Sequence, residues 1–209
     1  MLERNYEIAK VNFKRHLFAH FAVAVVFVLI APLLMGMKNL DGMQVAKIME
    51  FYLGFLGVIL LVPLFLPDTD KNIRDLLASK KTALVTVRLI RLLEAVLCLL
   101  VLLVLFLYIL KTGDCRFSYG ECLYAAVSNA VMMGGTGLLC YSLVDNIALA
   151  YMIPFLYYAM SMGGGEKYLG HFWLFGYSGG GNIWEKGWLF AGGILLGVLS
   201  LVIRGWRRT

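Results

Sequence analysis

The chain has 209 residues, of which 61% are hydrophobic and 15% are charged, and its mean hydropathy is +0.80. A soluble globular protein has about 45–50% apolar and about 25% charged residues, so the composition excludes a soluble globule and predicts an all-α integral membrane protein. The formal net charge of +6 does not predict a nucleic-acid partner, because the Lys and Arg residues gather at the ends of apolar segments and indicate topology there.

Six apolar spans account for most of the chain and leave no room for a separate soluble domain, so residues 1–209 are predicted to form a single transmembrane domain. The predicted spans cover residues 17–37, 48–66, 89–110, two stretches within 123–162 that meet at a tight turn at Asp145-Asn146, and 188–203. Residues 1–16 mix apolar and charged side chains, which predicts an N-terminal interfacial helix, with a solvated tail as the alternative.

Two carboxylates lie at the ends of predicted spans. Glu50 is at the outer end of the second span, where its side chain is expected to reach the membrane surface. Glu94 is one turn inside the third span; Arg91, three residues earlier, is its expected ion-pair partner, and Arg88 is also close. Ion pairing at the interface is favoured for Glu94 over a proton-relay role, because the residue lies near the charged end of its span.

The stretch from residue 67 to residue 88 is the longest charged interruption of the chain and predicts a short amphipathic helix at the membrane surface. Pro67 ends the preceding helix because it lacks a backbone donor, and Asp68, Thr69 or Asp70 can cap the next helix. Apolar residues then recur with helical spacing, and charged residues take the other positions. The apolar set is Ile73, Leu76 and Leu77, and the charged set is Lys71, Arg74, Asp75 and Lys80. A soluble partner can bind such a helix between two spans.

Two of the four cysteines, Cys115 and Cys122, lie seven positions apart around a predicted turn between the third and fourth spans. They can form a disulfide if this loop faces an oxidising compartment. Cys98 and Cys140 lie inside spans and are expected to be packing residues. No Cys or His spacing predicts a metal site.

Small residues recur four apart in two spans: Ala126, Ala130 and Gly134 in the fourth, and Gly193 and Gly197 in the last. Small side chains let helix backbones approach closely, so this pattern predicts helix–helix packing.

Two polar residues of the fourth span, Asn129 and Thr136, have two possible roles. Their side chains can hydrogen-bond across helices, and this structural role is the favoured interpretation. The alternative is that they line a polar path for a substrate.

Residues 163–187 place an aromatic patch between two runs of three glycines. The patch is too short to cross a membrane and its Trp and Tyr residues suit the headgroup level, so it is expected to lie on or dip into the outer interface as one or two short helices. His171 is isolated, and interfacial packing is favoured for it over a catalytic or metal role.

The distribution of positive charge predicts the orientation. With six spans, both termini, the stretch 67–88 and the Asp145 turn share one side of the membrane. That side holds 13 Lys and Arg residues and the other side holds 6, so the positive-inside rule predicts that the first side is cytosolic. We therefore expect a multi-pass protein of the plasma membrane with both termini in the cytosol.

Sequence patterns typical of catalysis are absent. The chain has no HExxH, GxSxG or P-loop motif, and neither glycine run follows a strand or supplies the Lys and Ser/Thr of a phosphate cradle. The chain is therefore not expected to be an enzyme, to contain a catalytic residue, or to bind a cofactor or a metal.

The predicted spans and loops, together with the segment LVPLFLPDTDKNIRDLLASKK, resemble the type-2 ATP-binding-cassette (ABC) permeases. The local pattern is a proline, acidic residues and then x-I-x-[DE]-L-L-x-S before the third span. The resemblance implies a cytosolic coupling helix at residues 69–79, seated in a groove of a nucleotide-binding subunit. The coupling residues that it implies are Asp68, Asp70, Ile73, Arg74, Leu76 and Leu77. The chain departs from the family in having Asp68 or Asp70 where glutamate is more usual.

The resemblance also implies partners and a function. The partners are an ABC ATPase subunit, a second permease subunit in a homo- or heterodimer, and membrane lipids. The function is ATP-driven export of an amphiphilic substrate, such as a peptide, a lipid-linked compound or a drug-like molecule. The separate subunit hydrolyses ATP, and the outer aromatic segment caps a pathway at the dimer interface. The alternative is a non-transporting immunity or sensor protein whose cytosolic loop binds a regulator.

Overall fold

The computed structural model describes residues 2–69 and 84–206, and within these ranges the chain is helical with no β-strand. The α-helices are α1 (Leu2–Asn12), α2 (Phe18–Met35), α3 (Gly42–Lys47), α4 (Leu56–Leu61), α6 (Leu84–Thr112), α7 (Tyr119–Val144), α8 (Ile147–Met162), α9 (Gly165–Leu169) and α10 (Lys186–Trp206). Wider π-helical turns lie at Phe13–Leu17 and Ile48–Tyr52, and tighter 3-10 turns at Leu53–Phe55, Val62–Thr69, Gly170–Phe172 and Ile183–Glu185. The predicted all-α class is confirmed for the described residues.

Five helical segments of the described chain are long and apolar enough to cross a membrane. They are Tyr6–Met35, Gly42–Asp68, Val85–Thr112, Tyr119–Val144 and Ile183–Trp206. The helix α8 is shorter: its 16 residues rise about 24 Å, against a hydrocarbon core of about 30 Å. After a bend of 110°, Gly165–Phe172 follows α8. The described residues thus form an all-α membrane protein with five such segments, or six if the bent pair is one span.

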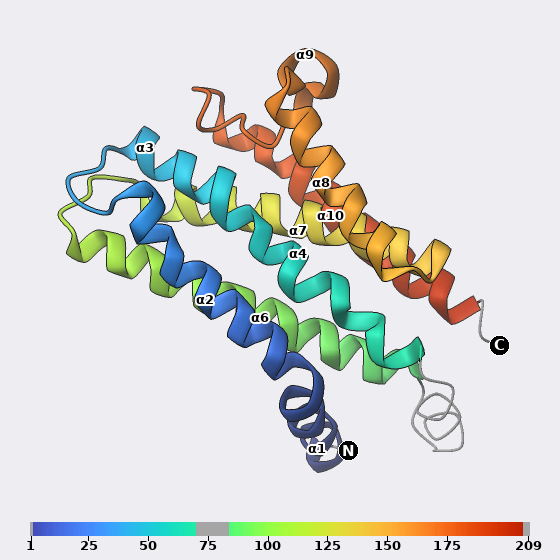
Figure 1. The fold of residues 1–209 in the computed structure, drawn as a ribbon. Helices are drawn as coiled ribbons and strands as arrows, with labels where there is room; N and C mark the ends of the chain where they lie inside the picture. Colours follow the sequence, from blue (N-terminus) through green and yellow to red (C-terminus); the bar gives the residue numbers. More distant parts are fainter. Residues whose placement is uncertain (1, 70–83, 207–209) are drawn as a thin grey trace.

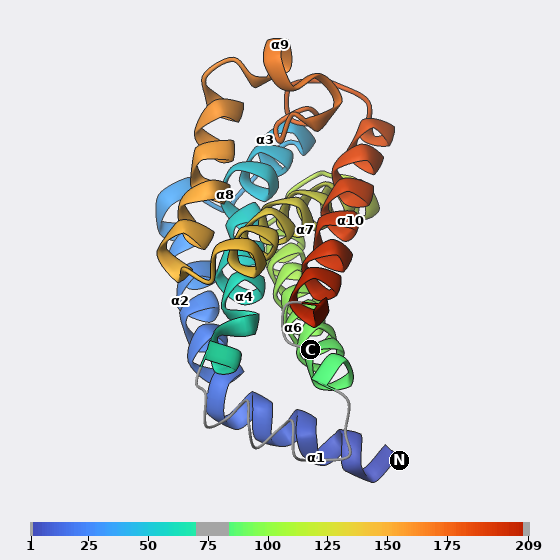
Figure 2. The ribbon, with the colours of Figure 1, turned by 90° about the vertical axis from the view of Figure 1, so that its right-hand side faces the viewer.

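The helix α7 is the centre of the bundle, and α4, α8 and α10 pack around it (Figures 1 and 2). In the apolar windows of Gly42–Asp68 and Tyr119–Val144, 78% and 67% of the residues are buried, against 22% in Tyr6–Met35 and in Ile183–Trp206. The second and fourth spanning segments therefore form the core. The first and last expose apolar side chains, as helices that face lipid do.

Glycine contacts explain how the central helices come so close. A Cβ added at Gly57 would lie 1.8 Å from Ala130 O, and one added at Gly193 would lie 2.6 Å from Met132 N. One added at Gly134 would lie 2.9 Å from Gly57 O. Such distances leave no room for a side chain, so the predicted close packing is confirmed at Ala130, Gly134 and Gly193. Gly197 does not share in it, because a Cβ there would meet nothing within 4 Å.

The second spanning segment is not a regular helix. A π-helical turn at Ile48–Tyr52 and a 3-10 turn at Leu53–Phe55 precede α4. A π-helical turn changes the side-chain register, and such turns are frequent at functional sites. Here the turn carries Glu50, which is only 1% exposed. The expectation that Glu50 reaches the membrane surface is therefore wrong.

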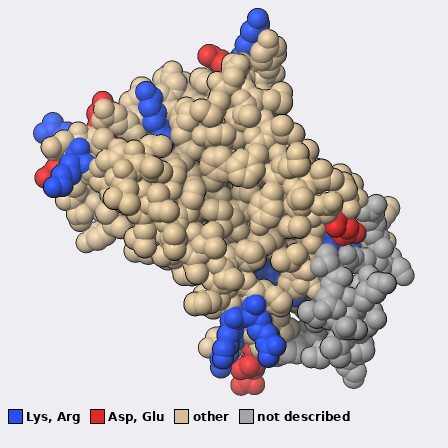
Figure 3. Space-filling model, in the orientation of Figure 1, with Lys and Arg blue, Asp and Glu red and all other residues tan. Residues whose placement is uncertain are grey.

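The N-terminal helix α1 lies across one end of the bundle, where it packs against α6 (Figure 2). The π-helical turn Phe13–Leu17 forms the elbow between α1 and α2. Around this elbow Lys10, Lys14 and Arg15 are exposed, and Lys and Arg side chains gather over α1 at the lower edge of Figure 3. The helical part of the prediction for residues 1–16 is confirmed over residues 2–16.

The two glycine runs fold the chain between α8 and α10 around Trp173. Gly164 and Gly180 have φ angles of 116° and 91°, which favour glycine. A Cβ at Gly165 or at Gly179 would lie 2.7 or 2.8 Å from the Trp173 ring. The glycines are thus required for turns and for close contact with one aromatic ring.

Candidate functional site

Glu50 and Lys186 form an ion pair inside the bundle, between the second spanning segment and the start of α10. Glu50 Oε1 lies 2.6 Å from Lys186 Nζ, and each residue is 1% exposed. Burying a charge in a membrane protein is costly, and the charges that occur there are almost always paired and often functional. The pair is therefore the first candidate for a functional site.

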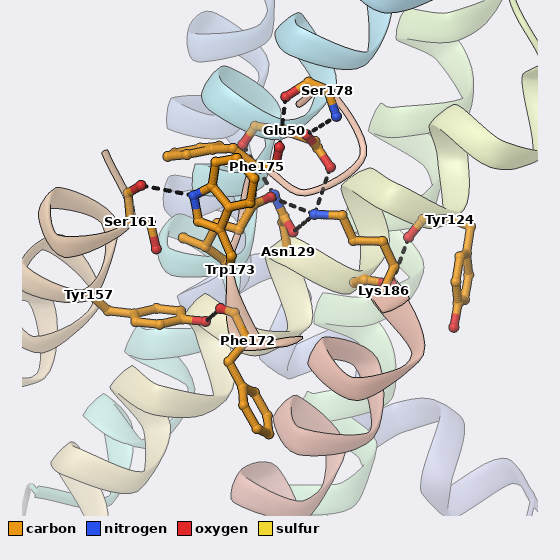
Figure 4. A network of polar contacts seen from close by, with 12 residues as sticks. Glu50, Tyr124, Asn129, Tyr157, Ser161, Phe172, Trp173, Phe175, Ser178 and Lys186 are labelled. Carbon is orange, nitrogen blue, oxygen red and sulfur yellow. Dashed lines mark hydrogen bonds and ion pairs between the residues drawn. The ribbon is translucent and has the colours of Figure 1, made fainter. Parts of the chain in front are cut away.

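Asn129 of α7 and the loop before α10 complete this site, which we call the Glu50 cluster: Glu50, Asn129, Ser178 and Lys186 (Figure 4). Lys186 Nζ donates to Asn129 Oδ1 at 3.1 Å and also to Leu174 O. Asn129 Nδ2 donates to Leu174 O at 2.7 Å, and the Ser178 N–H donates to Glu50 Oε2 at 2.8 Å. Three side chains from three spanning segments thus hold the backbone of one loop.

The loop that these residues hold dips back into the bundle, and we call residues 173–178 the re-entrant segment. Leu174 is 0% and Phe175 2% exposed, and the Phe175 ring stacks on Phe51 with 3.8 Å between centroids. Trp173 Nε1 donates to a carbonyl in the last turn of α8 at 2.9 Å (Figure 4). The re-entrant segment therefore fills this end of the bundle with packed side chains and does not lie only on its surface.

Tyrosine hydroxyls hold the flanks of the re-entrant segment. Tyr177 donates to Glu121 Oε2 at 2.7 Å, and Tyr157 of α8 donates to Phe172 O. Burial and the hydrogen bond to Glu121 raise the pKa of Tyr177 above its ordinary value.

The Glu50 cluster holds the re-entrant segment in place, and we call this role a latch. Lys186 pairs with one oxygen of Glu50 and the Ser178 N–H donates to the other, so both carboxylate oxygens have partners within the chain. Among the residues that the structure describes, no three His, Cys, Asp or Glu side chains are grouped to hold a metal ion. Buried pairs of this kind favour one arrangement strongly, because breaking them leaves a charge without its partner.

A second buried site lies at the other end of the second spanning segment. Asp68 Oδ2 lies 2.8 Å from Arg88 Nε, and Asp68 Oδ1 lies 2.7 Å from Arg91 Nη1. Asp68 is 3% and Arg88 2% exposed. The two arginines are three residues apart on α6, so one carboxylate joins the end of the second segment to the start of the third.

Arg204, near the end of α10, extends this site. Its Nε lies 4.0 Å from Asp68 Oδ2, and its Nη1 lies 2.9 Å from Asp145 Oδ1 and donates to Tyr141 O. The guanidinium group also lies 4.9 Å from the ring centroids of both Phe65 and Tyr141, within the range of a cation–π interaction. We call Asp68, Arg88, Arg91, Asp145 and Arg204 the Asp68 cluster. This cluster connects four parts of the chain: the second spanning segment, α6, α10 and the turn between α7 and α8.

The structure assigns partners to Arg91 and Glu94 that differ from the prediction. Arg91 binds Asp68, whereas Glu94 Oε2 accepts a hydrogen bond from Asn12 Nδ2. The physical reason is tertiary, because a carboxylate from another segment reaches Arg91 with better geometry than a neighbour on the same helix.

Of the coupling residues that the resemblance implies, Asp68 lies within the described residues. The others, Asp70, Ile73, Arg74, Leu76 and Leu77, lie outside them. The Asp68 carboxylate is buried and is taken up by ion pairs within the chain. The coupling role therefore stays a prediction.

The two thiols of the predicted disulfide are free in the structure. Cys115 Sγ lies 3.5 Å from Met37 O and 3.8 Å from Gly113 O, and Cys122 is fully buried. The pairing of Cys115 with Cys122 stays a prediction, and it would require Cys115 to leave these contacts.

The two residues considered for a polar path have different environments. Asn129 is fully buried in the Glu50 cluster. The Thr136 hydroxyl donates to Met133 O in its own helix, at 2.8 Å. The structure thus brings Asn129 together with charged groups and leaves Thr136 apart from them.

Lys186 and Arg204 were not recognised from the sequence as parts of a site. Each lies at an end of the last apolar span, where a basic residue is ordinarily a topology signal. A signal for Lys186 was present, because Glu50 of opposite charge lies at the same end of another span. The sequence contains no comparable signal for the pairing of Arg204 with Asp145.

Comparison of the chain with protein-family models, with curated proteins and with solved structures finds no match. The geometry of the two buried clusters and the pattern of the sequence are therefore the basis for a functional proposal.

Proposed function

We propose that the chain is the permease subunit of an ATP-driven exporter of the type-2 ABC kind. It pairs with a second permease subunit and moves an amphiphilic substrate outward. A separate subunit hydrolyses ATP and binds the cytosolic stretch 69–79. The stretch has the proline, the acidic residues and the spaced apolar residues described above.

The Asp68 cluster is the observation that supports this proposal most. Asp68 directly precedes the stretch that would bind the ATPase, and Arg88 follows soon after it. The cluster joins Asp68 to α6 and, through Arg204, to α10. A displacement of the stretch therefore acts on several spans at once, because breaking one buried ion pair costs about 3–5 kcal/mol. Coupling of ATP hydrolysis to transport needs such a connection.

The contacts at the two ends of α8 support six membrane crossings with both termini in the cytosol. The turn before α8 is bound to the Asp68 cluster through Asp145, and the last turn of α8 binds Trp173 beside the Glu50 cluster. Asp68 and Glu50 lie at opposite ends of the second segment. The helix α8 thus runs between the same two ends as the long helices, which supports counting it as the sixth crossing. The 13 to 6 charge distribution then supports a cytosolic Asp68 cluster.

In this proposal the re-entrant segment is the outer gate of the exporter. Leu174 and Phe175 fill the outer end of the bundle, and the Glu50 cluster holds them there. An outward-moving substrate needs this end to open. Lys186 lies at the start of α10, so a movement of α10 that begins at Arg204 reaches the latch directly.

The proposal is tested at the predicted apolar face of the stretch 69–79. Leu76→Asp introduces a charge where an apolar contact with the ATPase is expected, at a cost of several kcal/mol. Each 1.4 kcal/mol lowers the affinity for the ATPase tenfold. The amount of ATPase that co-purifies with the variant should therefore fall at least tenfold. Arg74→Ala is the matched control on the charged face, where an exposed ion pair is worth about 0–1 kcal/mol.

The measurements are the amount of ATPase that co-purifies and the ATP hydrolysis that substrate stimulates, for both variants and the unchanged chain. Normal insertion of Leu76→Asp in the membrane is the control for folding. If Leu76→Asp retains its ATPase and its stimulated hydrolysis as the unchanged chain does, the coupling role is refuted and most of the case for a transporter goes with it.

A further inference from the structure

A small recess lies at the elbow between α1 and α2, next to the Asp68 cluster, with which it shares Arg91. It is an open recess between the elbow, the second spanning segment and α6, and its empty volume of about 290 Å³ includes solvent space at its mouth. Its polar lining comes from Asn12, His16, His20 and Arg91. The rest of the wall is apolar and includes Leu64. His16 and His20 are four residues apart on one helical stretch, so they face the recess together.

The recess contains a cation whose hydrogen bonds are incomplete. Arg91 is 7% exposed, and its Nη1 binds Asp68, but its Nε is buried with no hydrogen-bond partner. Arg88 binds the other oxygen of Asp68, and its Nη2 is also buried without a partner. One carboxylate thus serves two guanidinium groups at hydrogen-bond distance and a third, that of Arg204, at 4.0 Å. Buried donors are almost always satisfied, so the Nε of Arg91 has room for a further hydrogen-bond acceptor.

We propose that this recess binds a phosphate group, either that of a membrane-lipid headgroup or free phosphate. The planar guanidinium group of Arg91 matches the oxygens of a phosphate better than an ammonium group does. The rings of His16 and His20 and the amide of Asn12 supply further polar groups at the same recess. This inference does not depend on the proposed transport function.

The surroundings favour an anion at headgroup depth. Lys10, Lys14 and Arg15 are exposed on α1 and the elbow, and Lys and Arg side chains gather over α1 in Figure 3. Basic residues that flank a span raise the local concentration of anionic headgroups, at about 1 kcal/mol each. The apolar wall of the recess suits the glycerol and acyl carbons that follow a lipid phosphate.

Two neighbouring carboxylates oppose an anion: Asp68, which binds Arg91, and Glu94, which provides a directional test. Glu94 accepts a hydrogen bond from Asn12, which lines the recess. Its negative charge repels a phosphate, so Glu94→Gln should strengthen binding while it keeps an acceptor for Asn12. A variant that only damaged the fold would not bind more tightly.

The experiment measures binding by the full-length chain, purified in a phosphate-free maltoside detergent. The probes are dioctanoyl phosphatidylglycerol, dioctanoylglycerol with the same chains and no phosphate, and inorganic phosphate. We expect phosphatidylglycerol to bind at least tenfold more tightly than dioctanoylglycerol, as measured by native mass spectrometry and by the shift in melting temperature. Competition by inorganic phosphate at similar concentration identifies free phosphate as a sufficient ligand, and its absence identifies the lipid headgroup.

The variants locate the site. Arg91→Lys keeps a cation for Asp68 but removes the Nε donor, and His16→Ala with His20→Ala leaves Arg91 intact. Each should weaken binding of phosphatidylglycerol at least tenfold. Lys14→Gln, an exposed cation outside the recess, is the control and should change binding less than twofold. Equal binding of the two lipids with no binding of phosphate overturns the proposal, as does unchanged binding by the His16→Ala, His20→Ala variant.

Discussion

Removal of the ammonium group in the Glu50 cluster tests whether this cluster latches the re-entrant segment. Lys186 Nζ contacts Glu50 Oε1, Asn129 Oδ1 and Leu174 O, and it is 1% exposed. Lys186→Met keeps the length and apolar stem of the side chain but leaves Glu50 buried with the Ser178 N–H as its hydrogen-bond donor. Breaking a buried pair from one side in this way costs about 3–5 kcal/mol.

The cost has a measurable size. For a chain of about this length, 1 kcal/mol shifts the melting temperature by about 2–4 °C, so Lys186→Met should lower it by about 6–20 °C. Glu50→Met should have a similar effect, because it leaves the ammonium group of Lys186 unpaired. The double variant removes both charges and leaves only neutral groups without partners, each at about 1–3 kcal/mol. It should therefore be destabilised by clearly less than the sum of the single variants.

The assay is thermal unfolding of the four proteins in the same detergent, followed by tryptophan fluorescence, since Trp173 lies in the re-entrant segment. The interaction energy from this double-mutant cycle should be about 2–3 kcal/mol in favour of the pair. Additive effects, within about 0.5 kcal/mol, would mean that Glu50 and Lys186 do not act as a pair and would refute the latch.

Three further outcomes are expected. Gly57→Ala should lower the melting temperature strongly, because its Cβ would lie 1.8 Å from a backbone oxygen of α7. Gly197→Ala is the control: its Cβ has open space, so it should be neutral or stabilising by up to about 1 kcal/mol. Equal effects of the two variants on the melting temperature would contradict the packing described. Asp68→Asn should cost about 3–5 kcal/mol of unfolding free energy, because two guanidinium groups share its charge, and an unchanged denaturation midpoint would contradict this. In a variant without native cysteines, a cysteine that replaces Ser79 should react with an impermeant thiol reagent only after cell lysis. A cysteine that replaces the exposed Tyr168 should react in intact cells. The reverse pattern would invert the proposed orientation.

The positions of the long helices follow closely from the sequence, because the burial of about 20 apolar residues in a lipid bilayer is a local requirement. The predicted spans 17–37 and 89–110 correspond to α2 and to most of α6. The turn at Asp145-Asn146 also lies where the pattern indicates, since the Asn146 side chain caps α8. The small-residue pattern predicted close packing, but it did not show that Gly57 would be the partner of Ala130.

The sequence by itself determined the membrane class, the helical content and the approximate limits of the spans, because hydropathy and capping act between residues close in the chain. The tertiary structure alone decided which charges are paired. Glu50 pairs with Lys186 and Asp68 pairs with Arg91, because helices that are distant in sequence pack side by side and place the atoms of each pair within 3 Å of each other. In a low-dielectric interior such contacts outweigh the nearer neighbours on the same helix, so no local pattern can predict them.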